Sequence, residues 1–134
     1  MGEAGTAREH HVAPEGMAPG TGYSHVVAAS GRFVSVAGQV ALNENGAVVG
    51  EGDPGAQAER VFENLRLALA AVGARFTDVV KFTFFLTDIG ILPAVREVRD
   101  RYIDTARPPA STAVQVSALF RPEMLLEVEA IAIL

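Results

Sequence analysis

The alternating pattern at the C-terminal end constrains the fold of this chain more than any other feature. Residues 126–133 read Leu-Glu-Val-Glu-Ala-Ile-Ala-Ile, and successive side chains of a β-strand point to opposite faces. A strand here places Glu127 and Glu129 on one face and a row of apolar side chains on the other. Burial of an isolated carboxylate is costly, so each glutamate needs solvent, a cationic partner or a cleft that uses its charge. A position at the rim and a functional cleft both satisfy this need.

The length and composition indicate one domain. The chain has 134 residues, which is enough for a core without disulfides or metals, and 49% of them are hydrophobic against 20% that are charged. Such an apolar composition in a short chain predicts that part of its surface is buried against other copies. The first residues lack any period, so we expect a flexible tail over residues 1–12 and a single domain over residues 13–134.

Charge and residue usage exclude several classes of protein. The net charge is −5 and the arginines are scattered, which disfavours binding to nucleic acid. The chain has no cysteine, and its three histidines lack the spacing of metal ligands, so no metal or other cofactor is predicted. Neither a signal peptide nor a membrane-spanning apolar run is recognisable, and we expect a soluble, cytoplasmic protein.

The periodicities predict an α+β fold. Residues 24–30 and 32–40 read as two strands of a hairpin, and a capped amphipathic helix starts at Asp53 and ends before Gly73. A central strand over residues 78–86, a second helix over 91–103, a strand over 111–119 and the C-terminal strand follow. Two helices can pack on one face of a single mixed sheet, and the other, largely apolar face then favours a closed oligomer.

Six short motifs occur in order along the chain. They are Gly22-Tyr23-Ser24, Val36 to Val40, Gln57 with Glu63-Asn64-Leu65, Val79 to Asp88, Pro109 to Thr112, and Glu127 to Ala132. Together these motifs are similar to those of the RidA family, also called the YjgF/YER057c/UK114 family, and the resemblance covers nearly the whole chain, from about Ala13 to Leu134.

The resemblance implies a fold, an assembly and a chemistry. It implies a chorismate-mutase-like fold of the bacillus type and a homotrimer around a central barrel, with clefts for small molecules between subunits. Typical members are enamine/imine deaminases, which hydrolyse reactive intermediates to a 2-keto acid and ammonia. The family also carries an endoribonuclease label, which the acidic net charge of this chain argues against.

The resemblance assigns catalytic roles to Glu127, which positions water, and to Tyr23. The arginine that normally holds the substrate carboxylate is replaced by Ser111 in the sequence Pro-Ala-Ser-Thr. Two further positions of the substrate-binding cleft also differ from the family pattern, and here they hold Ala37 and Ala113. A charged anchor in a partly desolvated cleft contributes about 2–5 kcal/mol. The substitutions therefore predict altered specificity, for a larger and less anionic ligand.

Three further residues complete the predicted substrate-binding set: Phe85, Arg107 and Arg121. Either arginine is a candidate to replace the missing cation in the cleft. The sequence leaves three interpretations open, namely a RidA-like enzyme with altered specificity, a trimer that binds a metabolite without converting it, and an endoribonuclease.

Overall fold

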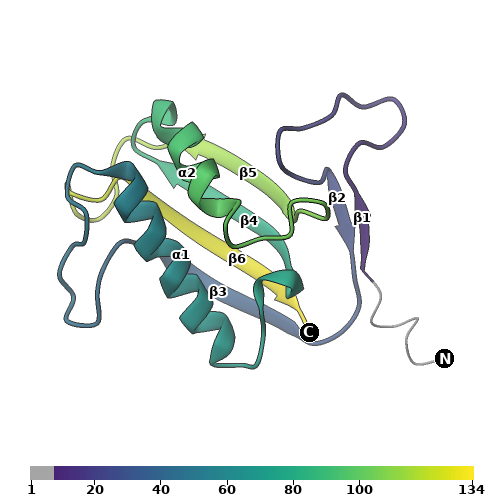
Figure 1. Cartoon of the computed structure of the whole chain (residues 1–134), viewed down its shortest axis with the longest axis horizontal. Helices are drawn as coiled ribbons and strands as arrows, with labels where there is room; N and C mark the ends of the chain where they lie inside the picture. Colours follow the sequence, from purple (N-terminus) through teal and green to yellow (C-terminus); the bar gives the residue numbers. More distant parts are fainter. Residues whose placement is uncertain (1–7) are drawn as a thin grey trace.

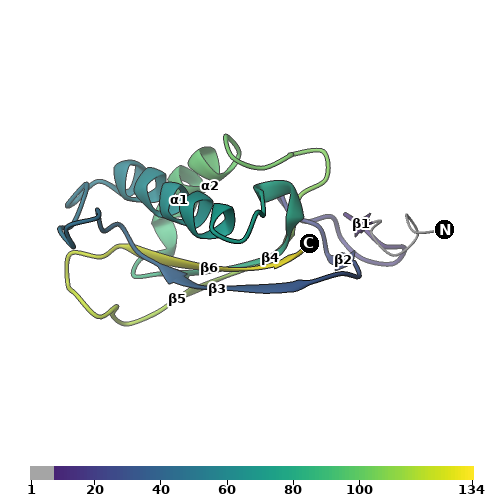
Figure 2. The same cartoon turned by 90° about the horizontal axis from the view of Figure 1, so that it is seen from below.

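The computed structural model describes residues 8–134, which form a four-stranded sheet with two helices on one face and a small two-stranded sheet beside it (Figure 1). In chain order the helices and strands are β1 (Glu9–His11), β2 (Val26–Ala28), β3 (Phe33–Gln39), α1 (Pro54–Ala70), β4 (Val79–Leu86), α2 (Leu92–Arg99), β5 (Ala110–Gln115) and β6 (Leu126–Ile133). The large sheet has the order β3-β6-β4-β5, in which only β4 and β5 are parallel. The predicted α+β arrangement, with two helices on one face of a mixed sheet, is confirmed (Figure 2).

Helix α1 begins where the sequence predicts. The Asp53 carboxylate accepts a hydrogen bond from the Ala56 N–H at 3.1 Å, and Pro54 occupies the first turn, where its missing N–H costs nothing. After the helix ends, Gly73 adopts a φ of 77°, which glycine reaches without strain. The side of α1 that faces the sheet is fully buried at Ala58, Val61, Phe62, Leu65 and Leu69.

Strand β6 separates the core from the opposite face as its alternation predicts. Leu126, Val128, Ala130 and Ala132 are buried beneath the helices, whereas Glu127 is half-buried and Glu129 exposed on the other side. The core is completed by an aromatic cluster whose contacting ring centroids lie 5.4–6.4 Å apart. Its members are Phe62, Phe76, Phe82, Phe84 and Tyr102.

The hairpin predicted from residues 24–30 and 32–40 is wrong. Strand β2 pairs with β1, and β3 instead pairs antiparallel with β6, with Phe33 opposite Ile133. The two strands diverge at Gly31, which has a φ of 142° and packs so closely on the C-terminal carbonyl of Leu134 that a Cβ atom would lie 2.2 Å from it. Pairing with β6 buries the apolar face of β3 under α1, which a local hairpin would not do.

Part of the expected N-terminal tail is ordered. Residues 9–11 of the expected tail form β1, and the His10 ring nitrogen Nδ1 lies 3.0 Å from the Pro108 carbonyl oxygen. Residues 1–7 of the expected tail lie outside the described residues. The second helix and the fifth strand are shorter than predicted, because a turn follows α2 and an irregular segment with a bend at Ser117 follows β5. Neither helix within residues 8–134 is long and apolar enough to cross a bilayer.

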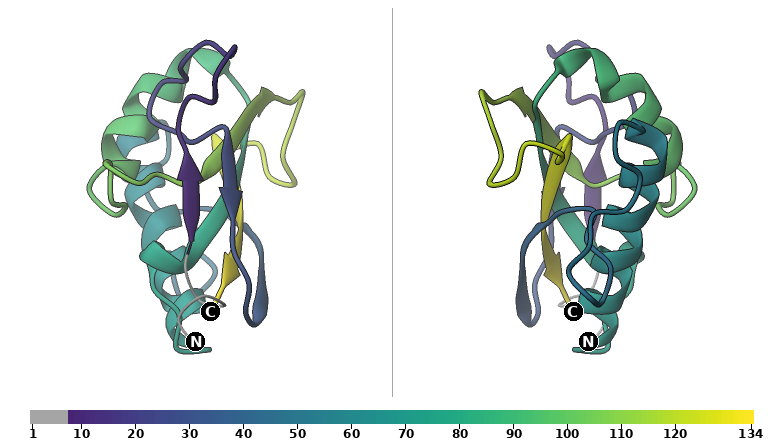
Figure 3. Two further views of the ribbon diagram at one scale, coloured as in Figure 1. Left: turned by 90° about the vertical axis from the view of Figure 1, so that its right-hand side faces the viewer. Right: turned by 90° about the vertical axis from the view of Figure 1, so that its left-hand side faces the viewer.

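The sheet face opposite the helices carries exposed apolar side chains. The loop between β5 and β6 extends on this side of the sheet (Figure 3). Phe33 in β3 is 63% exposed, Val114 in β5 is 40% exposed, and Phe120 in the loop is 68% exposed. A surface of this kind is typical of an interface, and the self-association expected from the composition remains a prediction.

Candidate functional site

A cavity of about 210 Å³ lies between α2 and β5, and we call it the Tyr23 cavity. Three residues of the predicted cleft, Tyr23, Ser111 and Ala113, line it together. Its complete lining is Thr21, Tyr23, Phe84, Leu92, Arg96, Arg99, Ser111 and Ala113. The cavity is thus built from a loop, a helix and an edge strand that are far apart in the sequence.

The register of the sheet places Ser111 and Ala113 in this cavity. Phe82 and Phe84 of β4 pair with Ser111 and Ala113 of β5, so these residues share the face covered by the helices. Ser24 attaches the loop that carries Tyr23 to the segment just before β5. Its hydroxyl donates to the Pro108 carbonyl at 2.6 Å and its N–H donates to the Pro109 carbonyl at 3.0 Å.

Two glycines allow the loop before β2 to approach its neighbours. The Tyr23 ring packs directly on Gly20, where a Cβ atom would lie 2.2 Å from the ring. Gly22 has a φ of 74° and leaves room for the Arg99 guanidinium, whose Nη2 would lie 2.2 Å from a Cβ atom. The motif Gly22-Tyr23-Ser24 therefore holds a tyrosine and an arginine at the same cavity.

The two arginines of α2 that line the cavity, Arg96 and Arg99, are not among the site residues predicted from the sequence. The Arg99 side chain is only 5% exposed, and its Nε and Nη2 atoms both lie 2.9 Å from Oδ1 of Asp100. Arg96 is half-buried, and its guanidinium has neither a hydrogen bond nor an ion pair within residues 8–134. The sequence does indicate that these arginines share a helix face with an apolar residue, because Leu92, Arg96 and Arg99 occur at spacings of four and three.

Glu127 lies outside the Tyr23 cavity, on the opposite face of the sheet. It pairs with Phe85 of β4, and its carboxylate lies against Gly38, where a Cβ atom would be 2.0 Å from Oε2. The register between β3 and β6 shifts at this point, just after the exposed Ala37. Within residues 8–134 Glu127 has no hydrogen bond or ion pair through its carboxylate, whose negative charge is therefore not neutralised by a neighbouring cation.

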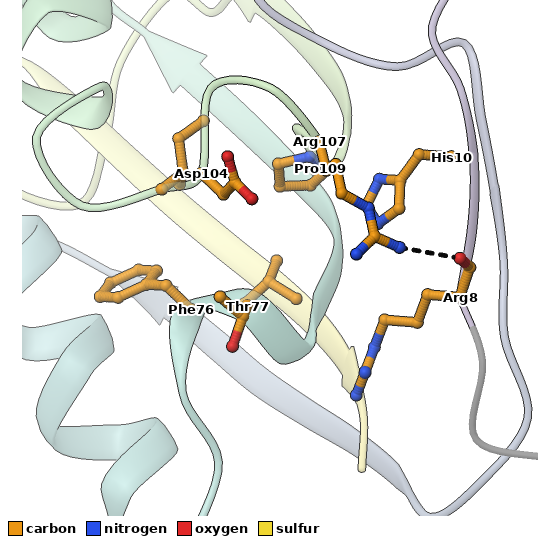
Figure 4. Close-up of a pocket in the computed structure, with 9 residues that line it drawn as sticks. Arg8, His10, Phe76, Thr77, Asp104, Arg107 and Pro109 are labelled. Atoms are coloured by element: carbon orange, nitrogen blue, oxygen red, sulfur yellow. Dashed lines mark hydrogen bonds between the residues drawn. The ribbon is translucent and has the colours of Figure 1, made fainter. Parts of the chain in front are cut away.

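The remaining candidates, Arg107 and Arg121, line neither region. Arg107 lies in a separate cavity of about 390 Å³, where its Nη2 atom donates to the Arg8 carbonyl at 3.0 Å (Figure 4). The Arg107 guanidinium lies between the side chains of His10 and Arg8 in this view. Arg121 donates through Nη1 to the Gly46 carbonyl at 3.2 Å. In this arrangement neither arginine replaces the cation that Ser111 lacks.

The structure therefore divides the predicted site between two faces of one sheet. Tyr23, Ser111 and Ala113 lie on the helix side at the β5 edge, whereas Glu127 and Phe85 lie on the open side. A single chain does not bring the two groups into one cleft. The arrangement offers cations and a phenol in one region, and a carboxylate that can accept a proton in the other.

Comparison with known proteins identifies the family. Residues 13–134 match the family model described as Endoribonuclease L-PSP. Protein DfrA of Myxococcus xanthus is 44% identical over 122 residues, covering 90% of this chain and 89% of the relative. The 2-iminobutanoate/2-iminopropanoate deaminase of Rattus norvegicus is 34% identical over 102 residues, covering 76% of this chain and 73% of the relative.

A solved structure agrees with these similarities. The crystal structure of YyfB from Yersinia pestis, a protein of unknown function in the conserved Rid family, superposes with a TM-score of 0.84 at 38% identity, covering 95% of this chain and 98% of the other. The match spans both faces of the sheet and therefore both parts of the divided site. The chain belongs to the RidA family, also known as the YjgF family.

Proposed function

We propose that this protein hydrolyses small imines or enamines to a carbonyl compound and ammonia, in clefts formed between subunits. The observation that carries the proposal is the division of the site, with Tyr23 at a cavity on one face of the sheet and Glu127 on the other. The two residues meet only if the open face of one copy packs against the β5 edge of another. A relative named as a 2-imino acid deaminase supports this choice of chemistry.

The assembly that fits this proposal is the homotrimer of a chorismate-mutase-like fold. Its support is the open sheet face, on which Phe33 is 63% exposed, and the projecting loop, on which Phe120 is 68% exposed. Burial of apolar surface contributes about 25 cal/mol per Å², so covering these side chains stabilises a closed oligomer. Each copy then contributes Tyr23 to one cleft and Glu127 to the next.

The chemistry requires few groups. Water adds to the imine carbon while the Glu127 carboxylate accepts one of its protons. That proton passes to the nitrogen, which gives a carbinolamine with an amino group. The hydroxyl proton of the carbinolamine is then also transferred to the nitrogen through Glu127, the C–N bond breaks, and ammonia leaves as the carbonyl forms. The Tyr23 hydroxyl donates a hydrogen bond that orients the water or the nitrogen. This reaction requires no oxidant, reductant or cofactor.

The test measures ammonia and keto-acid release from imino acids generated in situ by an amino-acid oxidase. Glu127→Gln keeps the shape of the side chain but removes its capacity to accept a proton, so turnover should fall about 10²- to 10⁴-fold. Glu129→Gln is the matched control, because Glu129 lies two residues further on the same face and is exposed. Full turnover in Glu127→Gln, measured against an enzyme-free reaction, contradicts the proposal.

Binding without turnover is the second candidate function. The observation that favours it is Ser111, which lines the Tyr23 cavity in the place where the resemblance expects an arginine. A trimer of this kind would be stabilised by its metabolite and release no product. A rise in melting temperature with added 2-keto acid, together with no ammonia release, distinguishes this function from catalysis.

A further inference from the structure

We infer that Arg96 and Arg99 of α2 form a carboxylate-binding group in the Tyr23 cavity and take the place of the arginine that Ser111 replaces. The inference rests on the proposed function only for the choice of ligand. The anchor has moved from the edge strand to the helix above it, so the cavity selects small carboxylic acids although position 111 is uncharged.

The charge balance of the cavity supports this inference. Arg99 is buried, and its only ion pair within residues 8–134 is with Asp100, which is 45% exposed. Arg96 adds a second positive charge, and no acidic residue lines the cavity. One of the two positive charges is therefore unneutralised. A guanidinium in a partly desolvated cavity without an anion is unfavourable, and a ligand carboxylate removes that cost.

The geometry assigns different tasks to the two arginines. The Asp100 contacts and the close fit to Gly22 hold Arg99 in place. Arg96 lies one helical turn before it, and its guanidinium has no protein partner among the described residues and is free to close on a ligand. Two neighbouring guanidinium groups can each donate to one carboxylate, with the Ser111 hydroxyl as a further donor at the same wall.

The size of the cavity narrows the ligand class. Its volume of about 210 Å³ is below the range of about 300–1,000 Å³ typical of drug-sized ligands. Phe84, Leu92 and Ala113 provide an apolar wall for a short carbon chain. These features fit a small aliphatic acid with its carboxylate at the arginines and its carbon chain along this wall.

The experiment compares binding of 2-oxobutanoate with binding of its neutral amide, 2-oxobutanamide, by calorimetry. The unmodified protein should prefer the acid, and Arg96→Gln should weaken acid binding at least about tenfold while leaving amide binding unchanged. Arg101→Gln is the matched control, because Arg101 lies in the turn just after α2 and pairs with Glu59 at the surface. Adding Ser111→Arg to the Arg96→Gln variant should restore the preference for the acid.

The outcomes separate this inference from the proposed function. Equal binding of acid and amide, no binding of the acid, or unchanged acid binding in Arg96→Gln overturns the inference. Acid binding that depends on Arg96, without turnover, would support the carboxylate site and contradict the proposed deaminase activity. Turnover with a KM that is the same in the unmodified protein and in Arg96→Gln would support the deaminase activity and contradict this carboxylate site. Circular dichroism confirms that each variant is folded.

Discussion

The contact between Glu127 and Gly38 allows the role of the carboxylate to be tested without changing it. In Gly38→Ala, the new Cβ atom would lie 2.0 Å from Oε2 and 2.8 Å from Cδ of Glu127. An ordinary contact needs at least 3.4 Å, so the carboxylate must move by about 1.4 Å. A misplacement of about 1 Å can cost about 10²-fold in rate, and we expect kcat to fall by about this factor.

The same substitution should cost little stability. Gly38 is not among the glycines with positive φ, so alanine fits its backbone, and the displaced atoms are the end of a flexible side chain. We therefore expect the free energy of unfolding to change by no more than about 1 kcal/mol. Oxidase-coupled turnover and urea denaturation, both at one protein concentration, measure the two effects separately.

A matched glycine serves as the control. Gly55 lies in the first turn of α1, and a Cβ atom there would lie no closer than 3.6 Å to any neighbour, so Gly55→Ala should leave activity unchanged. A folded Gly38→Ala protein with full turnover would refute the reasoning, because the position of Glu127 on Gly38 would then not matter. Unfolding of Gly38→Ala would contradict the claim that the side chain can move.

Two further predictions concern the stability of the fold. Gln57 is fully buried, donates to the Glu123 carbonyl at 2.8 Å and accepts from the Leu125 N–H at 2.9 Å. Gln57→Leu leaves these part-buried backbone groups without their side-chain partner and should lower the free energy of unfolding by about 2 kcal/mol, as urea denaturation would show. Burial, and then the charge of Glu63, raises the pKa of Tyr102. Its stabilising contribution is therefore complete below about pH 10 and is lost as the pH rises through the raised pKa. The melting temperature of Tyr102→Phe should therefore fall less between pH 9 and pH 11 than that of the unmodified protein. An equal fall in both proteins would contradict this prediction.

The elements that the sequence predicted well carry strong periodicity. The alternation of residues 126–133 and the capped apolar stripe of α1 specify both the element and its buried face. The hairpin failed because strand pairing is decided by distant partners. Residues 32–40 have the composition of a hairpin arm, but their apolar face is buried only beside β6, about a hundred residues away in the chain.

The candidate site was likewise predicted only in part. The motifs identified Tyr23 and Glu127, but the expectation of a less anionic ligand rested on Ser111, Ala37 and Ala113 and took no account of the arginines of α2. Arg96 and Arg99 were not predicted as site residues, because surface and buried arginines look alike in a sequence. Whether an arginine is buried depends on which loop packs over the helix, and here the loop at Gly22 covers Arg99.

The sequence by itself determined the α+β class, the buried faces of α1 and β6 and the family, because local periodicity and short motifs carry that information. Only the tertiary structure decided that Tyr23 and Glu127 lie on opposite faces of one sheet, and that two arginines of α2 share a cavity with Ser111. The physical reason is that a cavity is formed by the packing of segments distant in the chain. Its charge depends on every side chain that this packing encloses, and no single segment specifies that set.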